Sequence, residues 1–268
     1  MRWRQTVEDG WFVRETRPPP PSAAVFYVHG LGESGLSFEG LLAAPELASF
    51  HQVAPDMPGY GRSAWPEHAP SIDETVDDLA AFWRRRGEPP AVVVGHSLGG
   101  VLGQLLAERH PDLVLALVDV DGNKAGADAV FSGRAAAESL EAFVATGFER
   151  LREAVYRAGR RERAQRGYYA SLRLADPRVF HRHSVDLVAL SHGEDLARRL
   201  AALPMPKYYV AGAPGGASAR SLDLLRHAGV PTIAIAPAGH WPFLDQPVLF
   251  ATLLRDLVEH ALREGTGE

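Results

Sequence analysis

The stretch that decides the fold reads AVVVGHSLGG and runs from Ala91 to Gly100. Its first four residues form a short apolar run, which is typical of a strand buried on both faces of a parallel sheet. The remainder contains the pattern G-x-S-x-G, with Ser97 at its centre and a helical pattern starting at Leu98. On such a strand-to-helix turn the serine hydroxyl is exposed above the sheet, and the two flanking glycines relieve clashes with neighbouring backbone. The stretch therefore predicts that Ser97 is a nucleophile.

Similar apolar runs lie on both sides of this stretch and alternate with helical patterns. An opening hairpin is indicated by Asp9-Gly10, a dipeptide that tolerates the positive φ of a tight turn. We expect strands at residues 2–7, 11–16, 23–28, 53–54, 91–94, 114–120, 207–210 and 232–236. Beyond the hairpin, these runs indicate strands buried on both faces. Alternating strands and helices predict the α/β class, with a doubly wound, mostly parallel sheet of about eight strands.

The helical patterns carry start and stop signals. Ser71 with Glu74 fits a capping box, and Gly87 follows as a stop, so we expect a helix over residues 71–86. Pro247 suits the first turn of a closing helix. We expect further helices at residues 98–109, 218–228 and 247–262.

The alternation stops between residues 123 and 203, where the sequence becomes helical and rich in Ala and Arg. We expect an α/β core made of residues 1–122 and 204–268 and a helical insertion at 123–203 that lies over the sheet. Its arginines are interleaved with glutamates, which favours a solvated helix face. Its aromatic residues are candidates for lining a pocket, although most are expected to pack within the insertion: Phe131, Phe143, Phe148, Tyr156, Tyr168, Tyr169 and Phe180.

The composition narrows the classes of partner and compartment. The 268 residues carry a formal net charge of −5, so no overall positive field attracts nucleic acid or an anionic membrane surface, and we expect a small-molecule substrate. The chain has no cysteine, which excludes disulfides, thiolate metal sites and a cysteine nucleophile. The charged first 15 residues lack the apolar segment of a secretory signal, so we expect a cytoplasmic protein. Glycines interrupt the most apolar stretch, residues 91–107, which argues against a membrane span.

A serine hydroxyl needs a base, and His240 is the candidate. It follows the last expected strand, has Gly239 beside it to let the loop turn, and precedes the closing helix. In a parallel sheet, that loop emerges at the same carboxyl edge as Ser97.

The oxyanion that forms when serine attacks a carbonyl needs hydrogen-bond donors. After the strand at 23–28 comes the small-residue loop His29 to Gly32, so the expected donors are the backbone N–H groups of Leu31 and Leu98. A histidine immediately before such a glycine favours a structural hydrogen-bonding role for His29.

Four separated motifs in this order resemble those of the α/β-hydrolase superfamily: VHG at 28–30, DMPGYGRS at 56–63, GHSLGG at 95–100 and GH at 239–240. The resemblance covers nearly the whole chain and implies an α/β-hydrolase fold, with the helical insertion in the place of the variable cap domain. It also implies that Asp56 belongs to a shaped turn near the pocket and has a structural role.

The third member of a catalytic triad is a carboxylate that orients the imidazole. In much of the superfamily it follows the strand that is 207–210 here, but the next loop, AGAPGG at 211–216, has no acid, and Asp223 further on is expected to face away. Some members place the acid after the preceding strand, where this chain has Asp119 and Asp121. Strand alternation points both to one face; we favour Asp121 at the strand's mouth, with Asp119 as the alternative. A third reading is that the acid and the activity have been lost.

These residues predict acyl-transfer hydrolysis of a small, apolar ester, lactone or thioester-like substrate, by an esterase or lactonase that needs no metal and no organic cofactor. A serine at position 97 argues against the dehalogenases and epoxide hydrolases that the chain also resembles, which use a carboxylate nucleophile. Two alternatives remain open: carbon–carbon bond hydrolysis or lyase chemistry on the same triad, and a catalytically silent small-ligand-binding protein.

Overall fold

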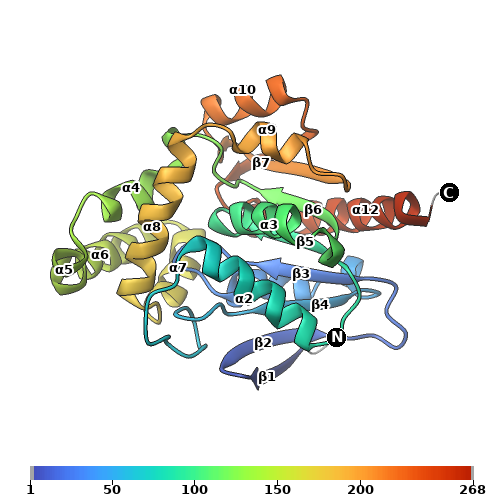
Figure 1. Cartoon of the computed structure of the whole chain (residues 1–268), viewed down its shortest axis with the longest axis horizontal. Coiled ribbons are helices and arrows are strands. Elements are labelled where there is room, and N and C mark those ends of the chain that lie inside the picture. The colour runs from blue at the N-terminus through green and yellow to red at the C-terminus, as the bar shows by residue number, and fades with distance from the viewer. Residues whose placement is uncertain (1–2, 267–268) are drawn as a thin grey trace.

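The computed structural model describes residues 3–266, and within them one eight-stranded sheet forms the centre of the molecule (Figure 1). The strand order is β1-β2-β4-β3-β5-β6-β7-β8. The pairs β1–β2 and β2–β4 are antiparallel, whereas the pairs from β4 through β3 to β8 are parallel. The predicted α/β class and mostly parallel sheet are confirmed.

The strands lie close to the predicted ranges, with the largest differences at their carboxyl ends. Their bounds are Arg4–Glu8 (β1), Trp11–Thr16 (β2), Ala24–Val28 (β3), His51–Pro55 (β4), Ala91–His96 (β5), Val114–Val120 (β6), Lys207–Gly215 (β7) and Thr232–Gly239 (β8). Arg2, the start of the first predicted strand, lies outside the described residues. The predicted hairpin is confirmed, because Asp9 and Gly10 join β1 to β2 with φ of +49° and +83°.

Burial on both faces was a wrong expectation for β8. This strand is the edge of the sheet, pairs only with β7 among the described residues, and leaves Thr232, Ala234, Ala236 and Pro237 exposed. A run of apolar residues shows that a segment suits a strand but not that other elements will pack over both of its faces.

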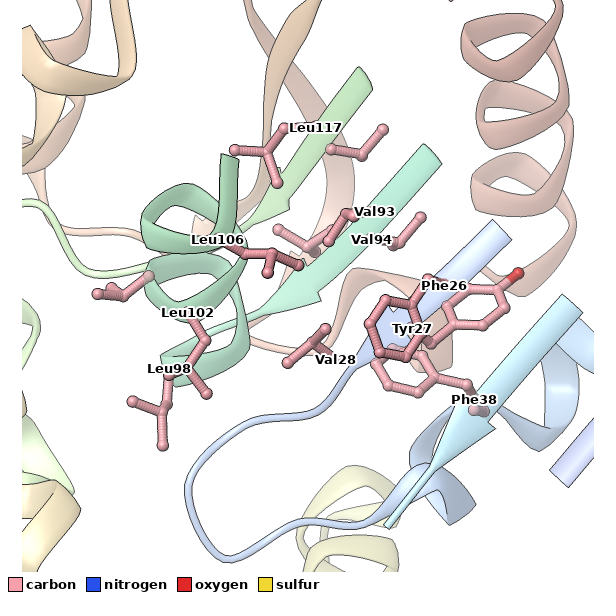
Figure 2. Close-up of a cluster of buried hydrophobic side chains, with 14 of the residues drawn as sticks. Phe26, Tyr27, Val28, Phe38, Val93, Val94, Leu98, Leu102, Leu106 and Leu117 are labelled. Carbon is pink, nitrogen blue, oxygen red and sulfur yellow. The ribbon is translucent and has the colours of Figure 1, made fainter. Parts of the chain in front are cut away.

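Consecutive residues of β3 carry the two layers of the core. Phe26 stacks on Trp83 of α2 (Ile72–Arg85), whereas Tyr27 stacks on Phe38 of η1 (Gly35–Phe38), as the alternation of side chains along a strand requires. Figure 2 shows Tyr27 and Phe38 side by side. Beyond Phe38 lie α1 (Glu39–Leu42), η2 (Pro45–Leu47), α11 (Pro242–Asp245) and α12 (Pro247–Thr266). The centre of the sheet is therefore covered on both faces.

Helix α3 (Leu98–Arg109) packs against β5 and β6 and is the predicted helix after Ser97. Its apolar residues Leu98, Leu102 and Leu106 follow one another along the helix beside the strands (Figure 2). The predicted capping box of α2 is present, with Ser71 and Glu74 each accepting from the other's backbone N–H. The helix α10 (Ala219–Ala228) follows β7, with Ser218 as its cap.

The segment between β6 and β7 is helical and gathers mainly at one end of the sheet, at the left of Figure 1. The helices of this segment are Gly126–Asp128 (η4), Val130–Ala136 (α4), Leu140–Ala142 (α5), Phe143–Gly147 (η5), Phe148–Gly159 (α6), Arg163–Leu172 (α7), Pro177–His192 (α8) and Leu196–Ala201 (α9). A short helix η3 (Pro111–Leu113) leads into β6. No helix among residues 3–266 combines the length and the apolar character needed to cross a membrane.

Candidate active site

Ser97 occupies the sharp turn between β5 and α3. Its φ of +54° and ψ of −116° place it in a region that non-glycine residues rarely adopt. A Cβ added to Gly95 would overlap the carbonyl oxygen of Gly99, and one added to Gly99 would overlap that of Val28. The predicted turn is confirmed, and both glycines are required by close approach of backbone.

The loop after β3 forms a tight turn beside Ser97. The Glu33 N–H donates to the Gly30 carbonyl over 3.1 Å, and Gly32 has a φ of +73°. Within the described residues, neither the Leu31 N–H nor the Leu98 N–H donates to a protein acceptor. Leu31 lines the same cavity as Ser97. The assignment of these two N–H groups as oxyanion donors stays a prediction.

His240 follows β8 and lines the cavity that Ser97 also lines. Enclosure by protein and the neighbouring His96 lower the pKa of the His240 imidazole to about 3. A neutral imidazole can accept a proton, as a general base must. The expected role of Gly239 in turning the loop was wrong, because Gly239 ends β8 without a positive φ; a Cβ on Gly212, in β7, would instead overlap the Gly239 carbonyl oxygen.

Asp121 is the carboxylate that the structure brings to His240. Its Oδ2 lies 3.8 Å from His240 Nδ1, and its own φ is +49°. Strand alternation would point Asp119 and Asp121 to one face, but β6 ends at Val120 and the left-handed backbone at Asp121 breaks that alternation. Burial raises the pKa of the Asp121 carboxyl to about 7, and hydrogen bonds from the backbone of Ala217 and Gly212 oppose this rise.

The acid-free segment at 211–216 was expected to be a loop, but most of it extends β7 to Gly215. This segment and Ala217 after it bind the Asp121 carboxylate. The Gly212 N–H donates to Oδ2 over 3.2 Å, and the Ala217 N–H donates to Oδ1 over 2.8 Å. A Cβ on Gly216 would overlap the same carboxylate oxygens. The small residues at the carboxyl end of β7 therefore make room for an acid that follows the neighbouring strand β6.

Asp119 has a different partner. Its Oδ2 lies 2.6 Å from the Lys124 Nζ, both side chains are fully buried, and its Oδ1 accepts from the Gly122 N–H. The side chain that distinguishes the two aspartates, Lys124, was missed from the sequence. A lysine five residues after an aspartate at a buried strand end was the available signal.

A second ion pair missed from the sequence lies behind His240. His96 Nδ1 is 2.8 Å from Glu33 Oε1, and His96 Nε2 is 2.7 Å from the His240 carbonyl oxygen. The Trp241 indole N–H also donates to Glu33. Glu33 raises the pKa of His96 against the opposing effect of burial, and the same pairing lowers the pKa of Glu33 to about 2. This pair anchors the segment that carries His240.

His29 and Asp56, the two residues predicted to be structural, are both held by hydrogen bonds to backbone groups. The His29 ring accepts from the Met57 N–H through Nε2, and its Nδ1 lies 2.9 Å from the Gly30 carbonyl. Asp56 is buried, pairs with Arg14 and accepts from the backbone of Gly35 and Arg62. Asp223 lies on α10 and pairs with Arg226.

The aromatic residues of the insertion divide into three groups. Phe131 and Tyr168 line the cavity at Ser97. Phe143, Phe148 and Phe180 pack on one another and are buried, whereas Tyr156 and Tyr169 form a separate pair. Among residues 3–266, no cluster of three or more His, Asp or Glu side chains is arranged to hold a metal ion.

Comparison with known proteins agrees with this architecture. The family model described as alpha/beta hydrolase fold matches residues 23–174, more than half of the chain. Lipase LipV of Mycobacterium tuberculosis is 43% identical over 104 residues, which are 38% of this chain and 38% of the lipase. The 2-(acetamidomethylene)succinate hydrolase of Mesorhizobium japonicum is 30% identical over 116 residues, 43% of this chain and 41% of that enzyme. The chain thus matches about two fifths of the length of these curated relatives.

A solved structure gives a likeness over the full length. The enol-lactonase from Burkholderia xenovorans has a TM-score of 0.76 at 18% identity, covering 96% of this chain and 100% of the lactonase. At this identity, the likeness concerns the fold.

Proposed function

Because the chain belongs to the α/β-hydrolase family, we propose that it is a serine hydrolase that cleaves an ester, lactone or thioester-like acyl bond of a small, apolar substrate. The observation that carries the proposal is the meeting of three groups at one edge of the sheet. Ser97 is held on its strained turn, His240 lines the same cavity, and Asp121 faces the far nitrogen of that imidazole.

In the proposed reaction Ser97 Oγ attacks the acyl carbon, and His240 Nε2 takes the hydroxyl proton. The N–H groups of Leu31 and Leu98 stabilise the oxyanion of the tetrahedral intermediate. Asp121 holds the imidazole with Nδ1 toward the carboxylate and stabilises its positive charge. His240 then protonates the leaving group. In the second half of the reaction His240 takes a proton from water, the water attacks the acyl-enzyme, and Ser97 Oγ leaves with a proton from His240.

The ion pair of Glu33 with His96 supports this assignment by fixing the backbone of His240 from behind. The nearby charge of His96 also disfavours protonation of His240 before substrate arrives. The activities named for two relatives, a lipase and a 2-(acetamidomethylene)succinate hydrolase, support hydrolysis of an acyl bond in this chain as well.

The test is covalent labelling with a fluorophosphonate that carries only small ethyl substituents, followed by peptide mapping. We expect one adduct, on Ser97, which is absent from Ser97→Ala and slowed in His240→Ala. Ser132→Ala is the matched control, because Ser132 lines the same cavity and lies outside the proposed machinery. No adduct on the wild-type protein, or an adduct that survives Ser97→Ala, would contradict the proposal and favour a catalytically silent binding protein.

A further inference from the structure

Two cavities of very different size meet at His240. The smaller, which we call the inner chamber, has a volume of about 40 Å³ and is lined by Ser97, Leu31, Tyr168 and Leu187, among others. The larger, the outer chamber, has a volume of about 520 Å³ and has Asp121, Val130, Ala164 and Ala217 in its walls. Ser97 lines only the inner chamber. The residues common to both chambers are Asp128, Phe131, His240 and Trp241.

The chemistry of acyl transfer assigns a different part of the substrate to each chamber. In acylation the bond between Ser97 Oγ and the acyl carbon forms, and the bond between that carbon and the leaving heteroatom breaks. The serine proton passes through His240 to the leaving heteroatom, so the leaving group departs on the His240 side. The acyl group stays bonded to Ser97 and must fit in the space that Ser97 lines.

The inner chamber is small enough to select the acyl group. One water molecule needs about 10–15 Å³ of such volume, so the chamber holds about three non-hydrogen atoms, the size of an acetyl group.

Its walls are packed rather than loose. Leu187 and Tyr168 are 2% and 5% exposed, and the Tyr168 ring contacts both Phe131 and Trp241. A longer acyl chain that extends toward α7 or α8 would have to displace these buried side chains.

The outer chamber suits a bulky leaving group. Its volume is more than ten times that of the inner chamber. Its walls combine the apolar side chains of Val130, Phe131, Ala164 and Trp241 with the charged side chains of Asp128, Glu162, Arg163 and Asp245. Volumes of this order are typical of sites that enclose a small organic molecule.

We propose, building on the function proposed above, that the substrate joins a short acyl group, of acetyl to propionyl size, to a bulky leaving group. Fatty-acyl esters are then poor substrates, even though one relative is named a lipase. Leu187 is the residue that sets the acyl limit, and Ala164 is one that keeps the leaving-group space open.

The first test measures kcat/KM for p-nitrophenyl acetate, butyrate, hexanoate and octanoate. We expect at least a tenfold fall from acetate to hexanoate in the wild-type protein. Leu187→Ala should raise the hexanoate-to-acetate ratio at least tenfold, because it removes three carbons from the chamber wall. Val179→Ala is the control, since Val179 is equally buried on the same helix but packs on Gly59.

The second test varies the leaving group at constant acyl group. Ala164→Phe should lower kcat/KM for 2-naphthyl acetate at least tenfold and leave methyl acetate within twofold. Gly167→Phe on the exposed side of the same helix should change neither.

The outcomes separate the two proposals. Labelling of Ser97 by the small fluorophosphonate, together with a wild-type rate that is flat or rises toward octanoate, overturns the size assignment and leaves the hydrolase proposal standing. Failure of that labelling overturns both. The size assignment is supported if kcat/KM falls from acetate to octanoate in the wild-type protein and this fall is reduced by Leu187→Ala but not by Val179→Ala.

Discussion

Asp119 and Asp121 lie two residues apart and bind opposite kinds of partner. Asp119 is neutralised by the ammonium of Lys124, whereas Asp121 accepts from two backbone N–H groups and faces His240. Asp121→Asn removes the charge that orients and stabilises the imidazolium. We therefore expect kcat to fall on the order of 10³–10⁴-fold while circular dichroism and the melting transition stay close to wild type.

Asp119→Asn should act on stability instead. It leaves the Lys124 ammonium buried without its carboxylate, which costs about 3–5 kcal/mol of unfolding free energy. Adding Lys124→Met to this variant should restore most of the loss, since both charges are then gone. Urea unfolding of the three proteins measures this. A turnover loss in Asp119→Asn larger than in Asp121→Asn would instead make Asp119 the triad acid.

At the scale of single elements, the turn between β5 and α3 needs glycines because side chains would not fit there. Helix α4 contains a glycine, Gly133, at a position where a side chain would fit. A Cβ at Gly95 would overlap the Gly99 carbonyl, whereas nothing lies within 4 Å of a Cβ at Gly133. Gly95→Ala should therefore lower the free energy of unfolding by about 2 kcal/mol or more. Gly133→Ala should stabilise it by about 0.5–1 kcal/mol, because alanine loses less backbone entropy in a helix. Thermal unfolding of both variants is the measurement, and equal melting temperatures would contradict the argument.

Local features such as turns and helix caps are the part of the structure that could be predicted from the sequence. The hairpin at Asp9-Gly10, the capping box at Ser71 and the turn at Ser97 each follow from a handful of adjacent residues. The partners of Asp121 and His96 could not be predicted in that way. The partners of Asp121 lie in the segment from Gly212 to Ala217, and the partner of His96 is Glu33. Each lies far from its partner in the sequence, and only the folded sheet brings the two together.

At the scale of the whole molecule, His183 joins the helical insertion to the core. On α8, its ring lies 2.8 Å from the Tyr60 hydroxyl and 2.9 Å from the Thr75 hydroxyl of α2. Burial lowers the pKa of His183 from 6.5 to about 4. Between these pH values the unfolded chain binds a proton that the folded protein does not, so this contribution to stability is present above pH 6.5 and is lost as pH falls toward 4.

The amide of His183→Gln can keep a hydrogen bond but cannot be protonated. We expect the unfolding free energy of this variant to fall less steeply between pH 6.5 and 4 than that of the wild type, by up to about 3 kcal/mol over the interval. Denaturant titrations at pH 7, 5.5 and 4.5 give the slope. Parallel pH profiles for the two proteins would show that His183 titrates normally in the folded state.

The ion pair at Asp119 has a further consequence for amine chemistry. The chain contains only two lysines, Lys124 and Lys207. The Lys207 Nζ donates to the Leu203 carbonyl at a half-buried site, whereas Lys124 is sealed from solvent. Acylating reagents that attack free amines will modify Lys124 only when the molecule opens around β6. The rate of that single modification, followed by mass spectrometry, therefore reports how often the floor of the proposed active site is exposed to water.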